Sequence, residues 1–307
     1  MRQYPPTQRP QRRASRRKSS LRILASIVFF SLFLLMGVFI FSFRNNEPEY
    51  VPAIVPVEEL PQDEDVLQLV PTPRVQLRDT GYLKLVNRYY YITSPMDYSN
   101  IVYAWPTVAV RATDITVHQT LLNAVSALFA TAEGRGPFFV TSGYRSVARQ
   151  AEIYENAVDR MYVLPPGHSE HNLGLAADIL VTDVPMSQMS GTPEAIWLAQ
   201  NAWRYGLVLR YPYGTTHITG VAYEPWHFRY VGRVHAWYMT TRSMVLEEYL
   251  EFLEESGGFA VELEGVEYHV IYQQDGESIY VPETLPFTLS KSNRGGYVVT
   301  VAIETAY

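Results

Sequence analysis

Residues 173–181, Leu-Gly-Leu-Ala-Ala-Asp-Ile-Leu-Val, form the most apolar stretch of the chain after residue 43, and they contain one carboxylate, Asp178. Moving an ionised carboxylate into an apolar surrounding costs several kcal/mol unless a positive group accompanies it. We therefore expect a buried strand over this stretch, with a positive partner facing Asp178. A Lys or Arg side chain satisfies that requirement, and so does a bound cation.

If the partner is a cation, histidines supply its other ligands. The chain has no cysteine, which excludes disulfides and thiolate ligands. His171 stands seven residues before Asp178, and His227 lies far downstream between two aromatic residues. Two imidazoles and one carboxylate are a standard set for a catalytic zinc that keeps a position open for water. Composition alone does not choose among the seven histidines, at positions 118, 168, 171, 217, 227, 235 and 269.

Two motifs make that choice. Ser169-Glu-His-Asn-Leu-Gly-Leu-Ala-Ala-Asp178 follows the pattern S-x-H-x-x-G-x-A-x-D, and Glu224-Pro-Trp-His227 follows the pattern E-P-W-H. Ser142-Gly-Tyr-Arg145-Ser precedes them, and Arg229-Tyr-Val-Gly232 follows them. In these motifs the chain resembles the metallo-D,D-carboxypeptidases of the VanY group and their L,D-carboxypeptidase relatives. The resemblance runs from about residue 82 to about residue 255.

The resemblance implies a role for each matching position. It makes His171, Asp178 and His227 the ligands of a Zn²⁺ ion. It makes Glu224 the general base that takes a proton from metal-activated water. It makes Arg145 the cation that stabilises charge on the substrate carbonyl, and it assigns substrate contacts to Ser169, Gln150 and Trp226. His168 is not expected as a fourth ligand, because a closed site leaves no position for water. Arg229 is expected to pair with a carboxylate of the site.

The pattern of residues 81–256 predicts an α+β domain, a small and mostly antiparallel sheet with flanking helices. Strands are expected at Leu83–Val86, Phe138–Thr141, around Asp178, and at Leu207–Arg210. Helices are expected after the N-caps Asp114, Ser146 and Thr192, ending near Gly134, Tyr162 and Gly206 respectively. The predicted architecture matches the fold that the resemblance implies, that of the hedgehog and D-Ala-D-Ala peptidase-like domains.

The N-terminal part of the chain predicts a membrane anchor. Residues 1–22 are a basic tail, and residues 23–43 contain 21 residues without a charge, long enough to span a bilayer as a helix. Six basic residues precede the apolar run closely and only Arg44 follows it at once, so the positive-inside rule places the tail in the cytoplasm. The run is longer than a signal-peptide core and lacks a small-x-small cleavage site, which favours an uncleaved anchor. We therefore expect a bacterial single-pass membrane protein whose catalytic domain lies on the extracellular side.

Two further segments flank the catalytic domain. Residues 44–80 contain six prolines and the acidic cluster 63–65, a composition typical of an extended spacer. Residues 257–307 alternate or run apolar between Glu264-Gly265 and Asp275-Gly276, which predicts a small β extension built of hairpins. About 50 residues are too few for an independent core, so this extension is expected to pack on the catalytic domain.

Charge and motifs together limit the classes of function that we expect for this chain. After residue 43 the chain holds 17 basic and 31 acidic residues, an excess of negative charge that argues against a nucleic-acid partner. The resemblance implies a zinc D,D-carboxypeptidase that removes the C-terminal D-alanine from peptidoglycan stem peptides. L,D-carboxypeptidase action on tetrapeptide stems uses the same chemistry and is the alternative, and a non-catalytic wall-binding module of the same fold is the alternative from another class. Oligomeric state is not predicted.

Overall fold

The computed structural model describes residues 55–56, 67–93, 98–132 and 137–304, all within one compact unit that spans Pro52–Tyr307. The basic tail and the expected membrane anchor at 23–43 lie outside the described residues. Within the described ranges, no helix combines the length and the apolar character needed to cross a bilayer.

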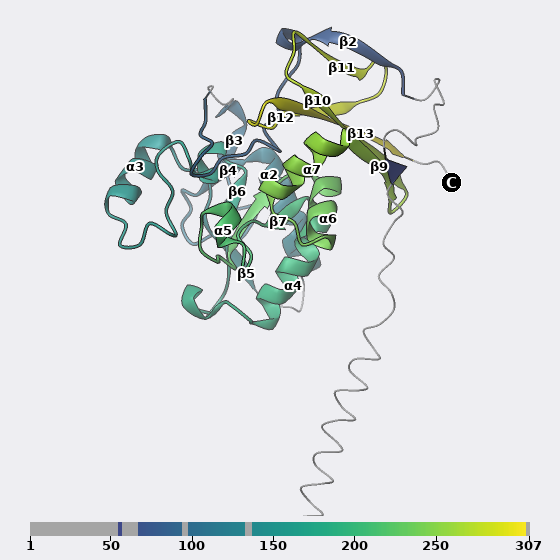
Figure 1. The fold of residues 1–307 in the computed structure, drawn as a ribbon. Coiled ribbons are helices and arrows are strands. Elements are labelled where there is room, and N and C mark those ends of the chain that lie inside the picture. Colours follow the sequence, from purple (N-terminus) through teal and green to yellow (C-terminus); the bar gives the residue numbers. More distant parts are fainter. Residues whose placement is uncertain (1–54, 57–66, 94–97, 133–136, 305–307) are drawn as a thin grey trace, which may run out of the picture. The chain divides into compact units, whose positions relative to one another are not determined.

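A four-stranded antiparallel sheet forms the centre of residues 81–256, the expected catalytic domain. Its strand order is β5-β6-β8-β7, with β5 at Phe138–Ser142, β6 at Ala176–Val181, β8 at His227–Tyr230 and β7 at Leu207–Leu209. Every residue of β6 is buried, as its apolar sequence predicts. The strands expected at 138–141, around Asp178 and at 207–210 are confirmed, and so is the small antiparallel sheet with flanking helices (Figure 1).

The described residues contain six α-helices: α2 (Gln119–Thr131), α3 (Val147–Glu155), α4 (Pro193–Asn201), α5 (Thr216–Thr219), α6 (Arg233–Thr241) and α7 (Leu246–Ser256). Helix α2 places Leu121, Val125 and Leu128 in one apolar cluster with Ile179 of β6 and Phe228 of β8. This packing closes one side of the central sheet. A separate antiparallel pair, β3 (Ile101–Tyr103) and β4 (Thr116–His118), leads into α2.

Helix starts follow the expected caps at two positions out of three. The side chains of Ser146 and Thr192 accept hydrogen bonds from the third residue of α3 and α4, which confirms both caps. The expectation that Asp114 caps α2 is wrong: the cap is His118, whose ring nitrogen accepts a hydrogen bond from the amide of Thr120. Residues 116–118 belong to β4, so the helix begins only after that strand ends. Helix α3 stops at Glu155, earlier than the expected end at Tyr162.

The strand expected at Leu83–Val86 is absent, although its apolar residues are buried. The backbone there makes hydrogen bonds to two different parts of the chain, whereas a strand would pair with one neighbouring strand on each side. The amide of Leu83 donates to Ser290 Oγ, and the amide of Leu85 donates to the carbonyl of Ser292. The carbonyls of Tyr82 and Lys84 accept from the guanidinium of Arg229. A buried arginine side chain therefore replaces a neighbouring strand as the hydrogen-bond partner of this segment.

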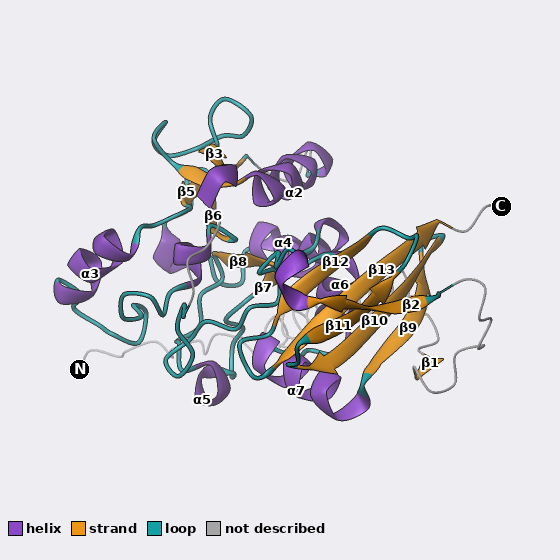
Figure 2. Ribbon diagram, turned by 90° about the horizontal axis from the view of Figure 1, so that it is seen from above, coloured by secondary structure: helices purple, strands orange, loops and turns teal. Residues whose placement is uncertain are grey.

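The C-terminal extension supplies four strands of a five-stranded antiparallel sheet against helices α6 and α7, and the fifth strand, β1, comes from the stretch expected to be spacer. Its order is β1-β9-β10-β13-β12, formed by Val55–Pro56, Gly258–Leu263, Val266–Gln274, Gly296–Glu304 and Phe287–Lys291. Phe259 and Val270 of this sheet share an apolar cluster with Trp237, Leu250 and Leu253 of the two helices. Figure 2 shows the sheet beside both helices. The extension packs on the catalytic domain, as its small size predicts.

One pairing in the extension differs from the hairpin pattern. The hairpin at Glu264-Gly265 joins β9 to β10 as expected. The hairpin expected at Asp275-Gly276 is not formed, because β10 pairs with β13 and not with the strand that follows this turn. Strand β11 (Ser278–Pro282) pairs instead with β2 (Leu69–Pro73), which lies within the stretch expected to be spacer. Two prolines of β2 lack an amide hydrogen, so this segment suits a two-stranded ribbon better than a sheet interior.

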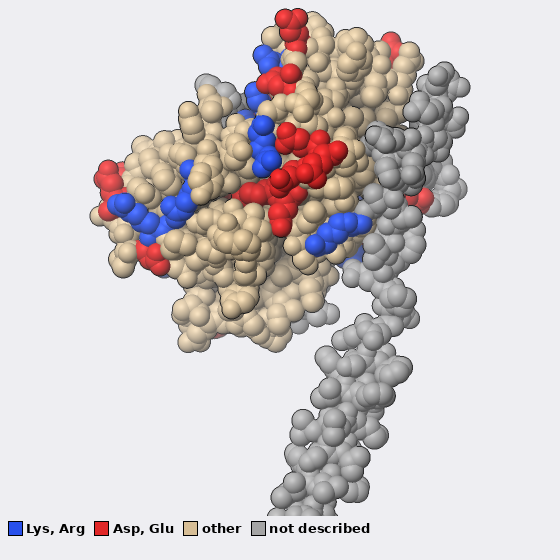
Figure 3. Space-filling model, viewed as in Figure 1, with Lys and Arg blue, Asp and Glu red and all other residues tan. Residues whose placement is uncertain are grey.

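Helix α7 has one buried apolar face and one acidic face that is at least partly exposed. Leu246, Leu250 and Leu253 point into the core, whereas the other face carries Glu248, Glu251, Glu254 and Glu255. Figure 3 shows acidic side chains gathered over this part of the surface. The helix therefore joins the extension to the catalytic domain through one apolar stripe and leaves a negative face outward.

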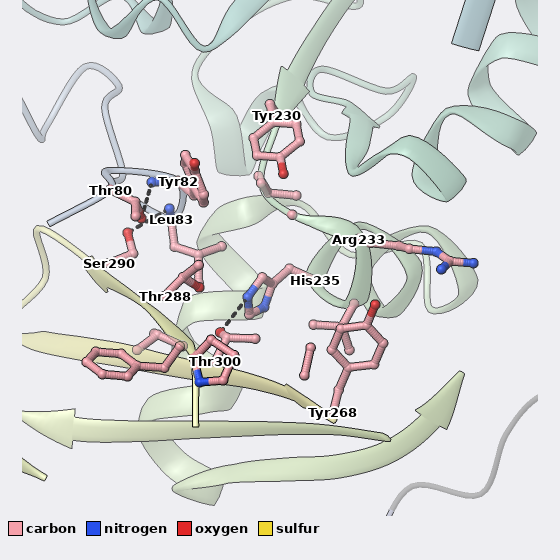
Figure 4. Close-up of a pocket in the computed structure, with 17 residues that line it drawn as sticks. Thr80, Tyr82, Leu83, Tyr230, Arg233, His235, Tyr268, Thr288, Ser290 and Thr300 are labelled. Atoms are coloured by element: carbon pink, nitrogen blue, oxygen red, sulfur yellow. Dashed lines mark hydrogen bonds between the residues drawn. The ribbon is translucent and has the colours of Figure 1, made fainter. Parts of the chain in front are cut away.

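A cavity of about 310 Å³ lies where α6 meets the C-terminal sheet (Figure 4). Its wall includes His235 of α6, whose Nε2 lies 2.9 Å from Thr300 Oγ1 of β13 and whose Nδ1 lies 2.6 Å from the hydroxyl of Tyr249 of α7. Burial lowers the pKa of His235 to about 3. A neutral imidazole thus bridges both helices and the sheet.

We expect His235 to make folding sensitive to acid. The unfolded chain protonates this imidazole below about pH 6.5, whereas the folded protein keeps it neutral to about pH 3. Its contribution to stability is therefore complete above pH 6.5 and is lost as the pH falls, by up to about 1.4 kcal/mol per pH unit. Urea unfolding of wild type and His235→Gln between pH 7 and pH 4, with a metal chelator present, should show a shallower pH dependence for the variant. Equal slopes would exclude this role.

Candidate metal and catalytic site

The central sheet brings the three expected ligands together. His171 lies in a 3-10 turn, Glu170–Leu173, directly before β6, while Asp178 lies within β6 and His227 begins β8. Asp178 and His227 are opposite one another in the antiparallel register of β6 and β8. Directly opposite residues share one face of a sheet, so both side chains lie on the face that the 3-10 turn approaches.

Two glycines allow His171 to reach that face. Gly174 ends the 3-10 turn with a φ of 73°, in the left-handed region that favours glycine. The carbonyl of Gly143 accepts a hydrogen bond from His171 Nδ1 at 2.7 Å. A Cβ on Gly143 would lie 2.3 Å from the carbonyl oxygen of Thr116, so only glycine lets this backbone pass so close to β4. The proton held on Nδ1 leaves Nε2 of His171 free to act as a ligand.

The three ligand atoms are spaced as a metal requires. His171 Nε2 lies 3.5 Å from Asp178 Oδ1, and His227 Nδ1 lies 3.2 Å from the same oxygen. All three atoms lie within 4.8 Å of one another. Tetrahedral zinc with bonds near 2.0–2.1 Å separates neighbouring ligand atoms by about 3.3 Å. Asp178 Oδ1 is buried and accepts no hydrogen bond, so a cation is the partner it lacks. The donor set and its spacing therefore fit Zn²⁺.

The carboxylate of Glu170 orients His227 from the side of the ring opposite to Asp178, a role that the motifs do not indicate. Nε2 of His227 lies 3.3 Å from Glu170 Oε2, which directs Nδ1 toward Asp178. A carboxylate behind a ligand histidine fixes the tautomer and raises the basicity of the ring. Glu170 stands beside His171 in the first motif, but only as an unspecified position. Its role depends on the strand β8, which no local pattern connects to it.

Two arginines neutralise Glu170. Arg210 Nε donates to Glu170 Oε1 at 2.8 Å, and Arg229 Nη1 donates to the same oxygen at 2.9 Å. Both side chains are fully buried. Arg210 also donates two hydrogen bonds to Glu247 of α7, at 2.9 Å and 2.7 Å. The expectation that Arg229 pairs with a carboxylate of the site is confirmed, with Glu170 as that carboxylate.

The buried charges shift each other's pKa in opposite directions. Burial alone would raise the pKa of Glu170, but the guanidinium groups of Arg210 and Arg229 outweigh it and hold the pKa well below the ordinary value. Burial opposes protonation of His227, but the carboxylates of Asp178 and Glu170 raise its pKa to about 9. Metal binding must displace the proton on Nδ1, so metal affinity should rise with pH.

Glu224 lies beside the ligands without joining them. Its Oε2 is 3.6 Å from His227 Nδ1, and the side chain is buried. Burial and the nearby carboxylate of Asp178 raise the pKa of Glu224 to about 8, against the influence of His227 and Arg145. A divalent cation held by the three ligands would oppose this shift and favour the carboxylate. The position suits a group that exchanges protons close to a metal.

Arg145 is held in place on both sides of its guanidinium. Nη1 donates to Gln150 Oε1 at 2.7 Å, and Nη2 donates to Ser142 Oγ at 3.0 Å. Gln150 is buried, and its amide nitrogen donates to the carbonyl of Leu164. Both ends of the Gln150 amide are therefore bonded within the protein, to Arg145 and to Leu164.

The remaining expected residues lie at the edges of the cluster. Ser169 is buried and caps no helix with its side chain, while Trp226 is half-buried and stacks on Tyr162 with ring centroids 6.5 Å apart. His168 Nδ1 lies 2.7 Å from the carbonyl of Asn87. Among the described residues, the grouped metal-binding side chains are His171, Asp178 and His227, and His168 is outside that group.

Comparison with known proteins identifies the same family that the motifs indicate. The family model VanY, D-alanyl-D-alanine carboxypeptidase, matches residues 114–233. A D-alanyl-D-alanine carboxypeptidase of Enterococcus faecium is 39% identical over 170 residues, which are 55% of this chain and 55% of that protein. The bifunctional D-Ala-D-Ala dipeptidase and D-Ala-D-Ala carboxypeptidase VanXYC of Enterococcus gallinarum is 35% identical over 129 residues, covering 38% of this chain and 68% of that protein. The chain spans about half the length of the first curated relatives that it matches.

A solved structure extends the likeness. The crystal structure of the vancomycin resistance D,D-dipeptidase VanXYg, in complex with a D-Ala-D-Ala phosphinate analog, is similar with a TM-score of 0.66 at 27% identity. The similarity covers 77% of this chain and 99% of that chain. This share is larger than residues 81–256 alone provide, so the structural likeness reaches beyond the part that the motifs indicate.

We expect Glu170→Gln to weaken Zn²⁺ binding by about 10- to 100-fold, because His227 loses the carboxylate that orients it. The variant should also unfold at lower temperature, because two buried guanidinium groups lose a neutralising charge. Competition with a chromophoric chelator measures the affinity, and circular dichroism checks that the variant is folded. Glu251→Gln, on the exposed face of α7, is the matched control. Wild-type affinity in a folded Glu170→Gln protein would contradict the role given to Glu170.

Proposed function

This chain belongs to the VanY family of D-alanyl-D-alanine carboxypeptidases, and from that membership we propose that it is a zinc-dependent D,D-carboxypeptidase. In this proposal it removes the C-terminal D-alanine from peptidoglycan stem peptides. The observation that carries the proposal is the buried Asp178 Oδ1, which has no hydrogen-bond partner and lies between two imidazole nitrogens, with Glu224 beside them.

His171, Asp178 and His227 would hold the zinc through Nε2, Oδ1 and Nδ1. Zinc bound there would supply Lewis-acid chemistry, polarising the scissile carbonyl and lowering the pKa of a water molecule to about 7. The protein contributes the fixed orientation of both rings. The carbonyl of Gly143 accepts a hydrogen bond from His171 Nδ1, and the carboxylate of Glu170 accepts one from Nε2 of His227.

Glu224 is the proton carrier in this mechanism. Its carboxylate takes a proton from the attacking water and delivers it to the amine nitrogen of the leaving D-alanine. Its buried position beside His227, and outside the three ligands, supports both steps. Negative charge grows on the carbonyl oxygen during attack, and in this proposal Arg145 is the permanently charged group that stabilises it. Gln150 and Ser142 keep the Arg145 guanidinium oriented.

We further infer an attachment to the cell membrane from the sequence of residues 1–43. The apolar run 23–43 would anchor the chain, with the basic tail in the cytoplasm and the catalytic domain on the extracellular side. That location would bring the site to peptidoglycan. Labelling of intact and of permeabilised cells with a membrane-impermeant reagent, on single cysteines introduced at Ser20 and at Tyr213, tests this orientation.

The products formed from defined stem peptides distinguish the candidate activities. A D,D-carboxypeptidase converts the pentapeptide to the tetrapeptide, an L,D-carboxypeptidase converts the tetrapeptide to the tripeptide, and a wall-binding module leaves both unchanged. We expect mass spectrometry to show D-alanine release from the pentapeptide. A chelator should abolish this release and added Zn²⁺ should restore it. Release that survives complete metal removal would contradict the proposed chemistry.

We expect His171→Ala and Glu224→Gln to fail in different ways. His171→Ala removes a ligand, so it should lose both zinc binding and D-alanine release. Glu224→Gln removes the proton carrier and leaves the ligands, so it should keep zinc while kcat falls by about 100-fold or more. Zinc content by atomic absorption and kcat on the pentapeptide separate the two. A Glu224→Gln protein with wild-type kcat would exclude Glu224 as the base.

A further inference from the structure

Glu247 of α7 is a buried carboxylate that lies outside the sequence motifs of the site. Its neighbour Glu248 accepts a hydrogen bond from the amide of Val245 and so caps the start of the helix. Glu247 takes no part in that cap and accepts three hydrogen bonds from other parts of the chain. The donors of these bonds show what this carboxylate holds in place.

A first route from Glu247 leads to a metal ligand. Both oxygens of Glu247 accept hydrogen bonds from Arg210, at 2.9 Å and 2.7 Å. The same guanidinium donates through Nε to Glu170 Oε1 at 2.8 Å, and Glu170 Oε2 lies 3.3 Å from Nε2 of His227. A planar guanidinium that is bound along two edges has a fixed orientation. Glu247 therefore fixes the group that holds the carboxylate behind His227.

A second route leads to the segment before the other imidazole ligand. Asn87 Nδ2 donates to Glu247 Oε1 at 3.0 Å, and Nδ1 of His168 lies 2.7 Å from the carbonyl oxygen of Asn87. His168 begins the segment 168–171, which ends on the ligand His171. The carboxylate of Glu247 is thus connected to this segment by two separate routes, one through a guanidinium and one through an amide.

The charges of this buried cluster balance only when Glu247 is ionised. Arg210 and Arg229 supply two positive charges, and Glu170 and Glu247 supply two negative ones, with no side chain more than 10% exposed. Without Glu247, two donors of Arg210 would lose their acceptor, and Glu170 would face an excess of positive charge. A carboxylate drawn toward two guanidinium groups orients His227 less strictly.

We propose that Glu247 is a positioning residue of the metal site and that it acts on His227 through Arg210 and Glu170. The proposal rests on the zinc site of the proposed function and adds a residue of α7 to it. Helix α7 also packs on the C-terminal sheet through Leu250 and Leu253. A helix that contributes no ligand thereby sets the affinity for the metal.

Zinc affinity of full-length Glu247→Gln, measured by competition with a chromophoric chelator, tests this role. We expect this variant to bind Zn²⁺ about three- to tenfold more weakly than wild type, a smaller loss than for Glu170→Gln because one more group separates it from the ring. Circular dichroism establishes that the variant is folded. Wild-type affinity in folded Glu247→Gln would overturn the proposal.

Glu248→Gln is the matched control, because it removes the same charge from the same helical turn and touches no member of the network. It should stay within about twofold of the wild-type affinity, since water screens its partly exposed charge. An equal loss of affinity in Glu247→Gln and Glu248→Gln would show a general effect of charge or helix stability and would reject the positioning role.

A double-mutant cycle tests the route through Glu170. If Glu247 acts through that carboxylate, adding Glu247→Gln to Glu170→Gln should weaken zinc binding by less than about twofold further. A full additional loss would mean that the two residues act independently, against the proposal. Should Glu247→Gln fail to fold, Glu247→Asp keeps the charge on a shorter side chain, and we expect an intermediate loss of about two- to fivefold. Wild-type affinity in folded Glu247→Asp would then reject the role.

The outcomes separate this proposal from the proposed function. Wild type that binds no Zn²⁺ rejects the zinc site and the role of Glu247 together. Wild type that binds Zn²⁺ but releases no D-alanine rejects the carboxypeptidase activity alone, and the affinities of the variants still decide about Glu247. Wild type that binds Zn²⁺ and releases D-alanine, with unchanged affinity in Glu247→Gln, rejects only the role of Glu247.

Discussion

The contact between Glu170 and the two buried arginines is the constraint on which the rest of the structure depends. A carboxylate without exposure to water is stable only when positive groups surround it, and here Arg210 and Arg229 provide them at 2.8 Å and 2.9 Å. Each arginine must then satisfy its remaining donors. Arg210 does so with Glu247 of α7, and Arg229 does so with the carbonyls of the segment 81–84. One buried charge thereby determines how three distant parts of the chain meet.

The same contact connects stability to the site. Glu170 also orients His227 through Nε2, so the ring that faces Asp178 is positioned by the network that holds α7 in place. Helix α7 in turn packs on the C-terminal sheet through its leucines. The extension therefore does more than cover an apolar face, because its packing partner supports the ligand geometry. Loss of one charge in this network removes a partner from several groups at once, which explains why such networks tolerate substitution poorly.

Electrostatics and exposure divide the site into an inner and an outer region. The inner region holds buried ionisable groups whose charges compensate one another, and its chemistry needs a cation to complete it. The outer region holds uncharged aromatic side chains, of which Tyr162 and Tyr213 are exposed whereas Tyr223 and Trp226 are half-buried. Glu224 lies at the junction, in the loop that also carries Tyr223 and Trp226.

Sequence alone determined the elements with strong local signals. The apolar stretch 173–181 predicts the buried strand, Ser146 and Thr192 predict two helix starts, and the motifs predict which residues meet around Asp178. Their side-chain chemistry and spacing along the chain carry that information. Only the tertiary structure decided the role of Glu170, the cap at His118, the irregular segment 83–86, and the pairing of β11 with β2. The role of Glu170, the segment 83–86 and the pairing of β11 with β2 depend on partners far away in the chain, and long-range hydrogen bonds leave no periodic pattern in the residues that form them. The cap at His118 is a local contact, but its position depends on the pairing of β4 with β3, which the helical periodicity of the following residues does not indicate.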